Sequence, residues 1–165
     1  MRIRPAGSGD LAEVVRTEIA SFATPWSPHT FLSLLDRETV LFRIAESEDG
    51  EMLGHGILWW VLDEGELANL AVRPEARGRG IGRRLLDVLL AEAALRGVER
   101  VFLEVRESNG VAIELYRERG FDQVGIRRKY YSSPVEDALV LQLDFPAPSP
   151  SSSSEPQREL MTDGP

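Results

Sequence analysis

Hydrophobic positions recur with a helical period near the start of the chain. Between residues 11 and 22 an apolar side chain returns every three or four positions, which predicts an amphipathic helix. The stripe expected to be buried consists of Leu11, Val14, Val15, Ile19 and Phe22. Asp10 and Glu13 have the spacing of a capping box at the start of this helix. A short first strand is predicted around Ile3.

The pattern then changes to short apolar runs separated by turn residues. Ser27 and Pro28 suit the N-cap and the first position of a short helix that runs to about Leu35. Strand-like runs follow, and they are close enough in the sequence to form antiparallel hairpins. They are residues 40–46, residues 52–62, and a third run that ends at Val72.

The second half of the chain alternates helices and strands. A helix is predicted from about Gly82 to Leu95, with Gly97 as its stop. After it come an apolar strand at Val101–Val105, a helix capped by Asn109 and stopped by Gly120, and strands at about 121–131 and 137–145. Hairpins followed by helix-separated strands predict an α/β fold, a mixed, mostly antiparallel twisted sheet with flanking helices.

Composition divides the chain once. Serine and proline dominate from Pro146 onward, and almost nothing there can be buried in a core. We therefore predict one domain over residues 1–145 and a disordered Ser/Pro-rich tail over residues 146–165. The domain is long enough to enclose a sizeable core.

Composition and charge exclude several classes of protein. The chain is 42% hydrophobic and 28% charged, as soluble globular proteins are. Its start lacks the apolar core of a signal peptide, and no run approaches the ~20 apolar residues of a membrane span. The absence of cysteine removes disulfides and a thiolate nucleophile. We expect a cytoplasmic protein without a membrane partner.

Charge and histidine content narrow the choice further. The formal net charge of −8 argues against direct nucleic-acid binding. His29 and His55 are the two imidazoles of the chain, too few for a His-rich metal site. Both are expected to be unremarkable surface or sheet residues.

A glycine-rich and arginine-rich loop between the strand ending at Val72 and the next helix has the features of an anion site. The segment 77–83 reads Arg-Gly-Arg-Gly-Ile-Gly-Arg. Glycines let the backbone approach a phosphate, and the helix N-terminus beyond them is positive. The bare pattern also fits an ordinary loop. A Walker A loop is excluded because Lys-Ser/Thr is missing, and the dinucleotide-binding Gly-x-Gly-x-x-Gly spacing is absent.

The arrangement Arg77-x-x-Gly80-x-Gly82 resembles the GNAT superfamily of N-acetyltransferases. The resemblance implies an acyl-CoA N-acyltransferase fold in which this loop holds the pyrophosphate of acetyl-CoA without a metal. It also implies which residues contact the coenzyme. They are Leu70, Ala71, Val72, Gly78, Arg79, Gly80, Ile81, Gly82, Arg83 and Asn109.

Acetyl transfer to an amine needs a group that removes a proton, and Glu104 is the leading carboxylate. It alternates with Leu103 and Val105 in an apolar strand, so it is expected on the opposite face, partly withdrawn from water. The alternative is an exposed strand residue or an ion-pair partner of Arg106. Two further carboxylates, Glu64 and Glu66, are expected to lie in a solvated hairpin.

Tyr116 is either a core aromatic or a general acid. It belongs to Asn109-x-x-Ala-x-x-x-Tyr116-x-x-x-Gly-Phe, which matches the superfamily pattern residue for residue. The resemblance implies that Asn109 and Tyr116 touch the coenzyme, with the phenol reaching its sulfur. It implies equally that Glu104 is the base.

Four segments resemble a subfamily, the RimI-type enzymes that acetylate the N-terminal alanine of a ribosomal protein. They are Pro25-Trp26-Ser27 with Phe31, the Gly loop with its preceding strand, Leu103 to Asn109, and Arg127 to Ala138. By this likeness the acceptor is the N-terminal peptide of a ribosomal protein. The stretch between Tyr131 and Glu136 is shorter than the subfamily leads us to expect, which puts peptide specificity in question.

An α-amine is also the easier target physically. Its pKa of ~7.7–8.0 makes deprotonation at neutral pH cost roughly 1 kcal/mol, against roughly 4–5 kcal/mol for lysine at ~10.4. The acceptor side is expected to be lined by Trp26, Phe31, Tyr130 and Tyr131, with one of the two adjacent tyrosines facing the sheet and the other the cleft. Two alternatives stay open, an acetyltransferase for a small amine or an internal lysine, and a non-catalytic acyl-CoA binding module.

Overall fold

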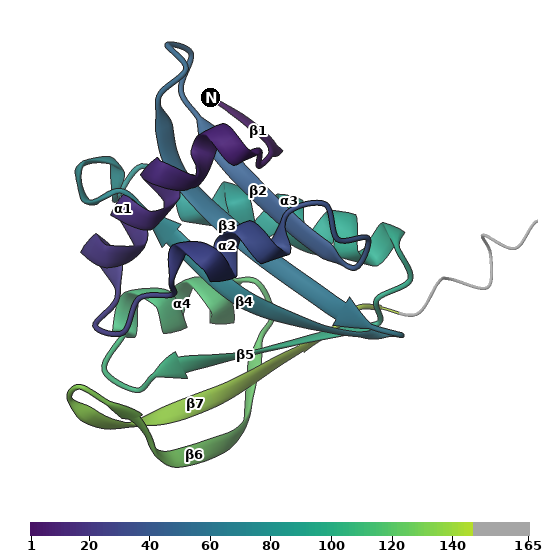
Figure 1. The fold of residues 1–165 in the computed structure, drawn as a ribbon. Helices are drawn as coiled ribbons and strands as arrows, with labels where there is room; N and C mark the ends of the chain where they lie inside the picture. The colour runs from purple at the N-terminus through teal and green to yellow at the C-terminus, as the bar shows by residue number, and fades with distance from the viewer. Residues whose placement is uncertain (147–165) are drawn as a thin grey trace, which may run out of the picture.

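One seven-stranded sheet forms the framework of residues 1–146, which are the residues described by the computed structural model (Figure 1). The strands are β1 (Arg2–Pro5), β2 (Val40–Glu46), β3 (Met52–Val61), β4 (Glu64–Val72), β5 (Arg100–Arg106), β6 (Asp122–Ser132) and β7 (Val135–Asp144). Their order is β1-β2-β3-β4-β5-β7-β6, and β4 with β5 is the parallel pair. The predicted mixed, mostly antiparallel sheet is confirmed. The segment predicted as a tail lies outside the described residues, apart from Pro146.

Helices cover both faces of the sheet (Figure 1). One face carries α1 (Leu11–Ser21) and α2 (Pro28–Leu34), and the other carries α3 (Ile81–Leu95) and α4 (Gly110–Glu118). Two short 3-10 turns complete the elements, η1 (Ser8–Asp10) and η2 (Pro74–Ala76). None of these helices is long and apolar enough to cross a membrane.

The sheet therefore separates two apolar cores. Under α3 and α4, residues such as Leu86, Leu89 and Ile113 pack on Leu103 and Leu141 of the sheet. Under α1 and α2, the core is built from Val14, Phe31, Leu34, Phe42, Ile44, Met52 and Ile57. Each helix buries one stripe, which is the pattern that the sequence periodicity predicts.

Most predicted caps and stops are confirmed. The Ser27 hydroxyl accepts the Thr30 N–H at 3.2 Å and begins α2, with proline at its first position. Asn109 Oδ1 accepts the Ala112 N–H at 3.2 Å and begins α4. Gly97 and Gly120 end their helices at φ values of 88° and 95°, which favour glycine.

The buried stripe of α1 differs from the prediction. Ile19 and Phe22 are 63% and 38% exposed, whereas Thr17 and Glu18 are buried. The stripe thus continues from Val14 at spacings of three and four residues, and a scan restricted to apolar residues assigns it to the wrong positions. The buried positions therefore include a carboxylate, that of Glu18.

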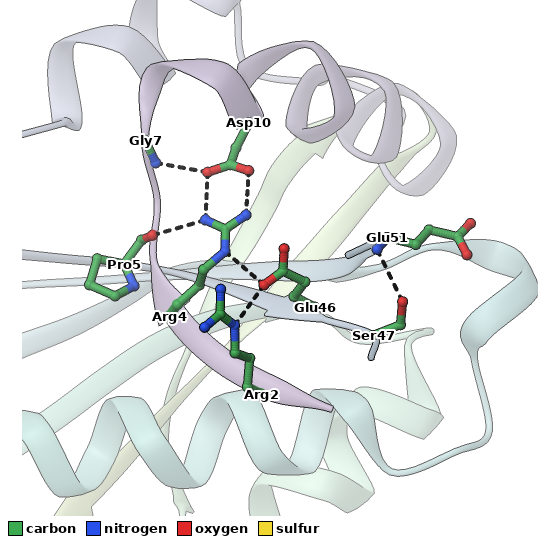
Figure 2. A network of polar contacts seen from close by, with 8 residues as sticks. All are labelled: Arg2, Arg4, Pro5, Gly7, Asp10, Glu46, Ser47 and Glu51. Carbon is green, nitrogen blue, oxygen red and sulfur yellow. Dashed lines mark hydrogen bonds and ion pairs between the residues drawn. The ribbon is translucent and has the colours of Figure 1, made fainter. Parts of the chain in front are cut away.

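The predicted capping box at the start of α1 is also wrong, because the carboxylate of Asp10 is used elsewhere. Asp10 caps α1 without a side-chain hydrogen bond and binds Arg4 instead (Figure 2). The Arg4 guanidinium donates to both Asp10 oxygens at 2.8 and 2.7 Å, and its Nε donates to Glu46 at 3.1 Å. The Arg4 hydrogen bonds lower the pKa of the Asp10 carboxyl below its ordinary value. This network joins β1, β2 and η1.

The feature that positions the site is the separation of β4 from β5. Three residue pairs join the strands at their beginnings, from Glu64 with Arg100 to Glu66 with Phe102. Beyond them the two strands diverge (Figure 1). On its other edge β4 carries a bulge at Ala68, where the register to β3 shifts. A bulge bends a strand locally and redirects the side chains beside it.

Candidate active site

A cleft of about 630 Å³ opens where β4 and β5 separate. One wall comes from the end of α1 and the loop that follows it, including Phe22 and Trp26. The opposite wall comes from β5, α4 and the β6–β7 hairpin. Among the predicted site residues, the cleft is lined by Leu70, Glu104, Asn109 and Tyr116.

Glu104 occupies the face of β5 that alternation predicts. Leu103 and Val105 point into the core under α3 and α4, while the Glu104 side chain lines the cleft and is 13% exposed. Its ion-pair partner is Arg127, with 2.7 Å between Arg127 Nε and Glu104 Oε1. The alternative partner considered from the sequence, Arg106, is wrong. A cation 23 positions away in the sequence reaches Glu104 because β6 and β7 fold back beside β5.

Arg106 instead joins β5 to the β6–β7 hairpin. It pairs with Glu136 at 3.3 Å and donates to the Pro134 carbonyl at 3.1 Å. Its guanidinium lies 4.2 Å from the centroid of the Tyr131 ring, a cation–π contact. Arg106 therefore fixes one wall of the cleft rather than the carboxylate inside it.

Tyr130 and Tyr131 both line the cleft, contrary to the predicted alternation. The pairing register shifts between Arg127 and Tyr131, and Lys129 has a φ of 51°, so strict alternation fails at this bulge. A side-chain hydrogen bond to Glu104 raises the pKa of Tyr130. Burial, with Glu104 and Tyr130 nearby, raises the pKa of Tyr131 to about 12. Both phenols are thus protonated donors near the carboxylate at neutral pH.

Tyr116 reaches the cleft from the other side of the sheet, on α4. Its side chain packs edge-on against Phe121, with ring centroids 5.8 Å apart, and the residue is 8% exposed. Burial raises the pKa of its phenol above the ordinary value. The residue is therefore both a core aromatic and a cleft residue, and its hydroxyl keeps its proton until a strong base is close.

Along β4, the backbone N–H and C=O groups of every second residue face the opening between β4 and β5. The Arg73 N–H donates to β3 at 2.8 Å, so Ala71 also directs its backbone groups to β3. Leu70 and Val72 then face the side from which β5 has separated. The Val72 carbonyl accepts Arg77 Nε at 3.1 Å from that side, in agreement. Within the predicted segment, Leu70 and Val72 offer N–H groups and Ala71 does not.

The Gly loop leads directly from β4 into α3. Gly78 and Gly80 have φ values of 79° and 77°, and a Cβ added at either would meet nothing within 4 Å. The Arg84 N–H closes the first helical turn on the Gly80 carbonyl at 3.1 Å. The preceding N–H groups, of Ile81, Gly82 and Arg83, therefore point out of the helix end.

The arginines of the loop are held by their own neighbours. Arg79 donates to the Glu75 carbonyl at 3.2 Å, and Arg83 pairs with Glu118 of α4. The Ile81 side chain is 4% exposed in a small core, so its backbone is the part that faces outward. The loop lies at the end of β4 and is separate from the lining of the cleft.

Two other predictions about the acceptor side have different outcomes. Phe31 is fully buried in the core under α1 and α2, so its predicted place in the lining is wrong. Trp26 does line the cleft and stacks on Trp59 at 5.8 Å. Glu66 accepts the Trp59 indole N–H at 2.9 Å and is only partly exposed, rather than free in a solvated turn.

A buried polar cluster lies beside the cleft and is absent from the predictions made from the sequence. Glu18, His55 and Asn69 are 1%, 0% and 7% exposed, so His55 is not the unremarkable residue that was expected. Asn69 donates to both oxygens of Glu18 at 3.2 and 3.0 Å and contacts His55 Nε2 at 3.1 Å. The available signal was the position of Glu18, four residues after Val14 on the buried stripe.

Comparisons with known sequences agree with this geometry. A profile described as the acetyltransferase (GNAT) family matches residues 11–121. The ribosomal protein bS18-alanine N-acetyltransferase of Escherichia coli strain K12 is 40% identical over 136 residues, which is 81% of this chain and 90% of that protein.

Solved structures give the same result. The crystal structure of the ribosomal-protein-S18-alanine N-acetyltransferase from Escherichia coli has a TM-score of 0.82 and 37% identity, covering 90% of this chain and 96% of that one. A ribosomal-protein-alanine N-acetyltransferase from Brucella melitensis has a TM-score of 0.77 and 26% identity, covering 88% and 100%.

Proposed function

The chain belongs to the acetyltransferase (GNAT) family, and from this premise we propose that it acetylates the α-amine of an alanine-terminated ribosomal protein. Acetyl-CoA is the proposed donor. The observation that carries the proposal is the cleft between β4 and β5, which places Glu104 and Tyr116 beside one open strand edge. Relatives named for this activity match along most of the chain.

The residues at the end of β4 fit the phosphates of the coenzyme. Gly78 and Gly80 leave open space beside the backbone, and the first N–H groups of α3 point out of the helix end. Anions bind at such ends because unpaired N–H groups and the helix dipole are both favourable. In our proposal Gly78 to Arg83 hold the pyrophosphate, and Asn109 contacts the coenzyme beside α4.

We assign the steps of the reaction to the open edge of β4 and to the side chains of Glu104 and Tyr116. Acetyl-CoA supplies an acetyl thioester, and the amine must lose a proton as it gains the acetyl group. Glu104 takes that proton, directly or through a water, and its ion pair with Arg127 holds the carboxylate at the cleft. In our proposal the N–H groups of Leu70 and Val72, which face the opening, donate to the thioester oxygen.

Tyr116 supplies the second proton of the reaction, to the sulfur that leaves. Its buried phenol is protonated at working pH and lines the same cleft. Because it comes from α4 and Glu104 comes from β5, the donor and the acceptor of protons do not compete for one position. A binding module would need neither group, so their presence in one cleft supports an enzyme.

An acetylation assay on peptides tests the proposal. The purified protein is incubated with acetyl-CoA and three peptides of one sequence. The first has a free N-terminal alanine and an internal lysine. The second keeps the lysine and has a blocked N-terminus. The third keeps the free N-terminal alanine and has arginine in place of the lysine. Fragment mass spectrometry locates the acetyl group. We expect α-amine acetylation of the first and third peptides and none of the second.

The other outcomes select the alternatives. Modification of lysine in the blocked peptide would replace the proposal with an internal-lysine acetyltransferase. Tight binding of acetyl-CoA without modification of any peptide would favour a small-amine acceptor or a binding module. Turnover of free coenzyme in the presence of small amines would then separate those two.

A further inference from the structure

The cluster of Glu18, Asn69 and His55 lies directly behind the cleft and has no role in the chemistry proposed above. Glu18 belongs to α1, Asn69 follows the bulge of β4, and His55 belongs to β3. Glu18 and Asn69 contribute to the lining of the cleft, and the Glu18 side chain is only 2% exposed. A carboxylate buried this deeply must be compensated by donors around it.

The donors around Glu18 come from three separate segments. Glu18 Oε1 accepts the backbone N–H of Trp26 at 3.1 Å, and Asn69 Nδ2 donates to both carboxylate oxygens. His55 Nε2 lies 3.5 Å from Glu18 Oε2 and 3.1 Å from Asn69 Oδ1. A single side chain therefore joins α1 and the α1–α2 loop to the bulged edge of β4.

The hydrogen bonds of the cluster have one direction, set by the carboxylate. An ionised Glu18 only accepts, so the Asn69 NH₂ group must face it and Asn69 Oδ1 must face His55. His55 then carries its proton on Nε2. His55 Nδ1 has no partner within the described residues, so a proton there would be buried without an acceptor.

The loop that Glu18 holds forms the wall of the cleft opposite β5. Phe22, Thr24 and Trp26 line that wall, and Trp26 is fixed further by stacking on Trp59. An acceptor peptide must enter between this wall and the β6–β7 hairpin, because β4 and the Gly loop are occupied by the coenzyme in our proposal. The position of the Trp26 backbone thus sets the width available to the peptide.

We propose that Glu18 is a positioning residue, which acts through the Trp26 N–H and Asn69 to hold the acceptor wall at the right distance from β4. The inference rests on the proposed peptide acetylation. Glu18 does not touch the reacting atoms, since its oxygens are taken by Trp26 and Asn69. Its loss should weaken the binding of the peptide and leave the binding of acetyl-CoA intact.

Glu18→Gln tests this because it keeps the shape of the side chain and replaces one accepting carboxylate oxygen with a donating NH₂ group. The new NH₂ group would face the Asn69 NH₂ group, unless Asn69 turns over and forces the His55 proton onto the partnerless Nδ1. Hydrogen bonds to a charged group contribute more to stability than neutral ones. Their loss around Glu18 should therefore raise the KM of the alanine peptide about tenfold. The KM of acetyl-CoA and the kcat should stay near wild type.

The control is Glu13→Gln on the same helix, where Glu13 is partly exposed and pairs with Arg16. It should change neither KM. A second readout needs no activity, namely the hydrogen exchange of the Trp26 amide measured by NMR. That amide should exchange faster in Glu18→Gln and remain protected in Glu13→Gln, so this readout separates failure of the positioning role from failure of the proposed reaction.

Should Glu18→Gln not fold, Asn69→Ser provides a milder variant. It keeps the strand and a hydroxyl but cannot bridge Glu18 and His55. A selective rise in peptide KM, with faster exchange at Trp26, supports the positioning role. Equal rises of both KM values in the variant would overturn it. So would an unchanged peptide KM in the variant, provided that the wild-type protein acetylates the peptide. Unchanged exchange at Trp26 would overturn it as well.

Discussion

Two polar networks in this molecule both pair arginine with carboxylate, and they differ in whether the paired groups face a cleft. The network of Arg2, Arg4, Asp10 and Glu46 lies at the β1 edge of the sheet, and its carboxylates meet guanidinium groups of the same network (Figure 2). The network of Glu104, Arg127 and Tyr130 faces the cleft. Its arginine is 58% exposed, whereas Arg4 is 27% exposed.

The contrast shows how geometry assigns a role to an ion pair. Arg4 contacts two carboxylates from different elements, so it joins β1, β2 and η1 and serves stability. Arg127 contacts Glu104 from the solvent side of a cleft and can move away without opening a core. We therefore expect changes in the first network to alter unfolding and changes around the second to alter turnover.

The largest expected effect is on turnover and comes from the far side of the cleft. Tyr116→Phe keeps the ring against Phe121 and removes the proton that the leaving sulfur needs. Turnover should fall by about 10²–10⁴-fold, the usual range for general acid–base groups. The melting temperature should change little, because the structure gives the phenol no hydrogen-bond partner among the described residues. Steady-state kinetics with nearly unchanged turnover would assign Tyr116 to the core alone.

A somewhat smaller effect is expected at the Gly loop. Gly80→Asp puts a carboxylate where the phosphates should approach, at a φ of 77°. Affinity for acetyl-CoA, measured by calorimetry, should fall about 10- to 100-fold, which corresponds to about 1.4–2.8 kcal/mol.

The matched control for the loop is Gly97→Asp, at the other end of α3. Gly97 also has a positive φ, 88°, and open space around it. The Gly97→Asp substitution therefore introduces the same backbone strain and the same charge, but away from the Gly loop. Equal losses of affinity in the two variants would mean that strain, and not phosphate binding, explains the result.

The smallest expected effect, on stability alone, is in the Arg4 network. Asp10→Asn removes the charge that Arg4 contacts twice, and the free energy of unfolding should fall by about 1–2 kcal/mol with kcat unchanged. Because the folded-state pKa of Asp10 is lowered, its stabilisation is complete above the ordinary carboxyl value of about 4 and is lost as pH falls below it. Acid unfolding of the two proteins should therefore converge at low pH. A parallel offset at every pH would argue against the ion pair.

Local patterns predicted the elements well and the contacts between them poorly. The caps at Ser27 and Asn109 and the glycine stops depend on neighbours in the sequence, so the sequence is enough to predict them. The partner of Glu104 is 23 residues away and was assigned wrongly to the adjacent Arg106. Only the folded order of β5, β7 and β6 brings Arg127 to it.

The polar cluster behind the cleft was missed for the same reason. Glu18 lies at a buried helical position, but a polar residue there gives no hydrophobic signal. Asn69 and His55 come from different strands, and their pairing depends on the bulge at Ala68. The separation of β4 from β5, which creates the cleft, likewise has no local signature in the sequence.

The most direct test of the central claim is the pH–rate profile of Glu104→Gln beside that of wild type, with exposed Glu107→Gln as the control. Turnover of the alanine peptide should fall by about 10²–10⁴-fold in Glu104→Gln. The decline of kcat/KM toward acid pH should then follow only the ionisation of the peptide α-amine, because the enzyme base is gone. Affinity for acetyl-CoA and the melting temperature should stay close to wild type. Near-wild-type turnover with an unchanged acid limb would show that Glu104 is not the base and would leave proton removal to Glu64, Glu66 or solvent.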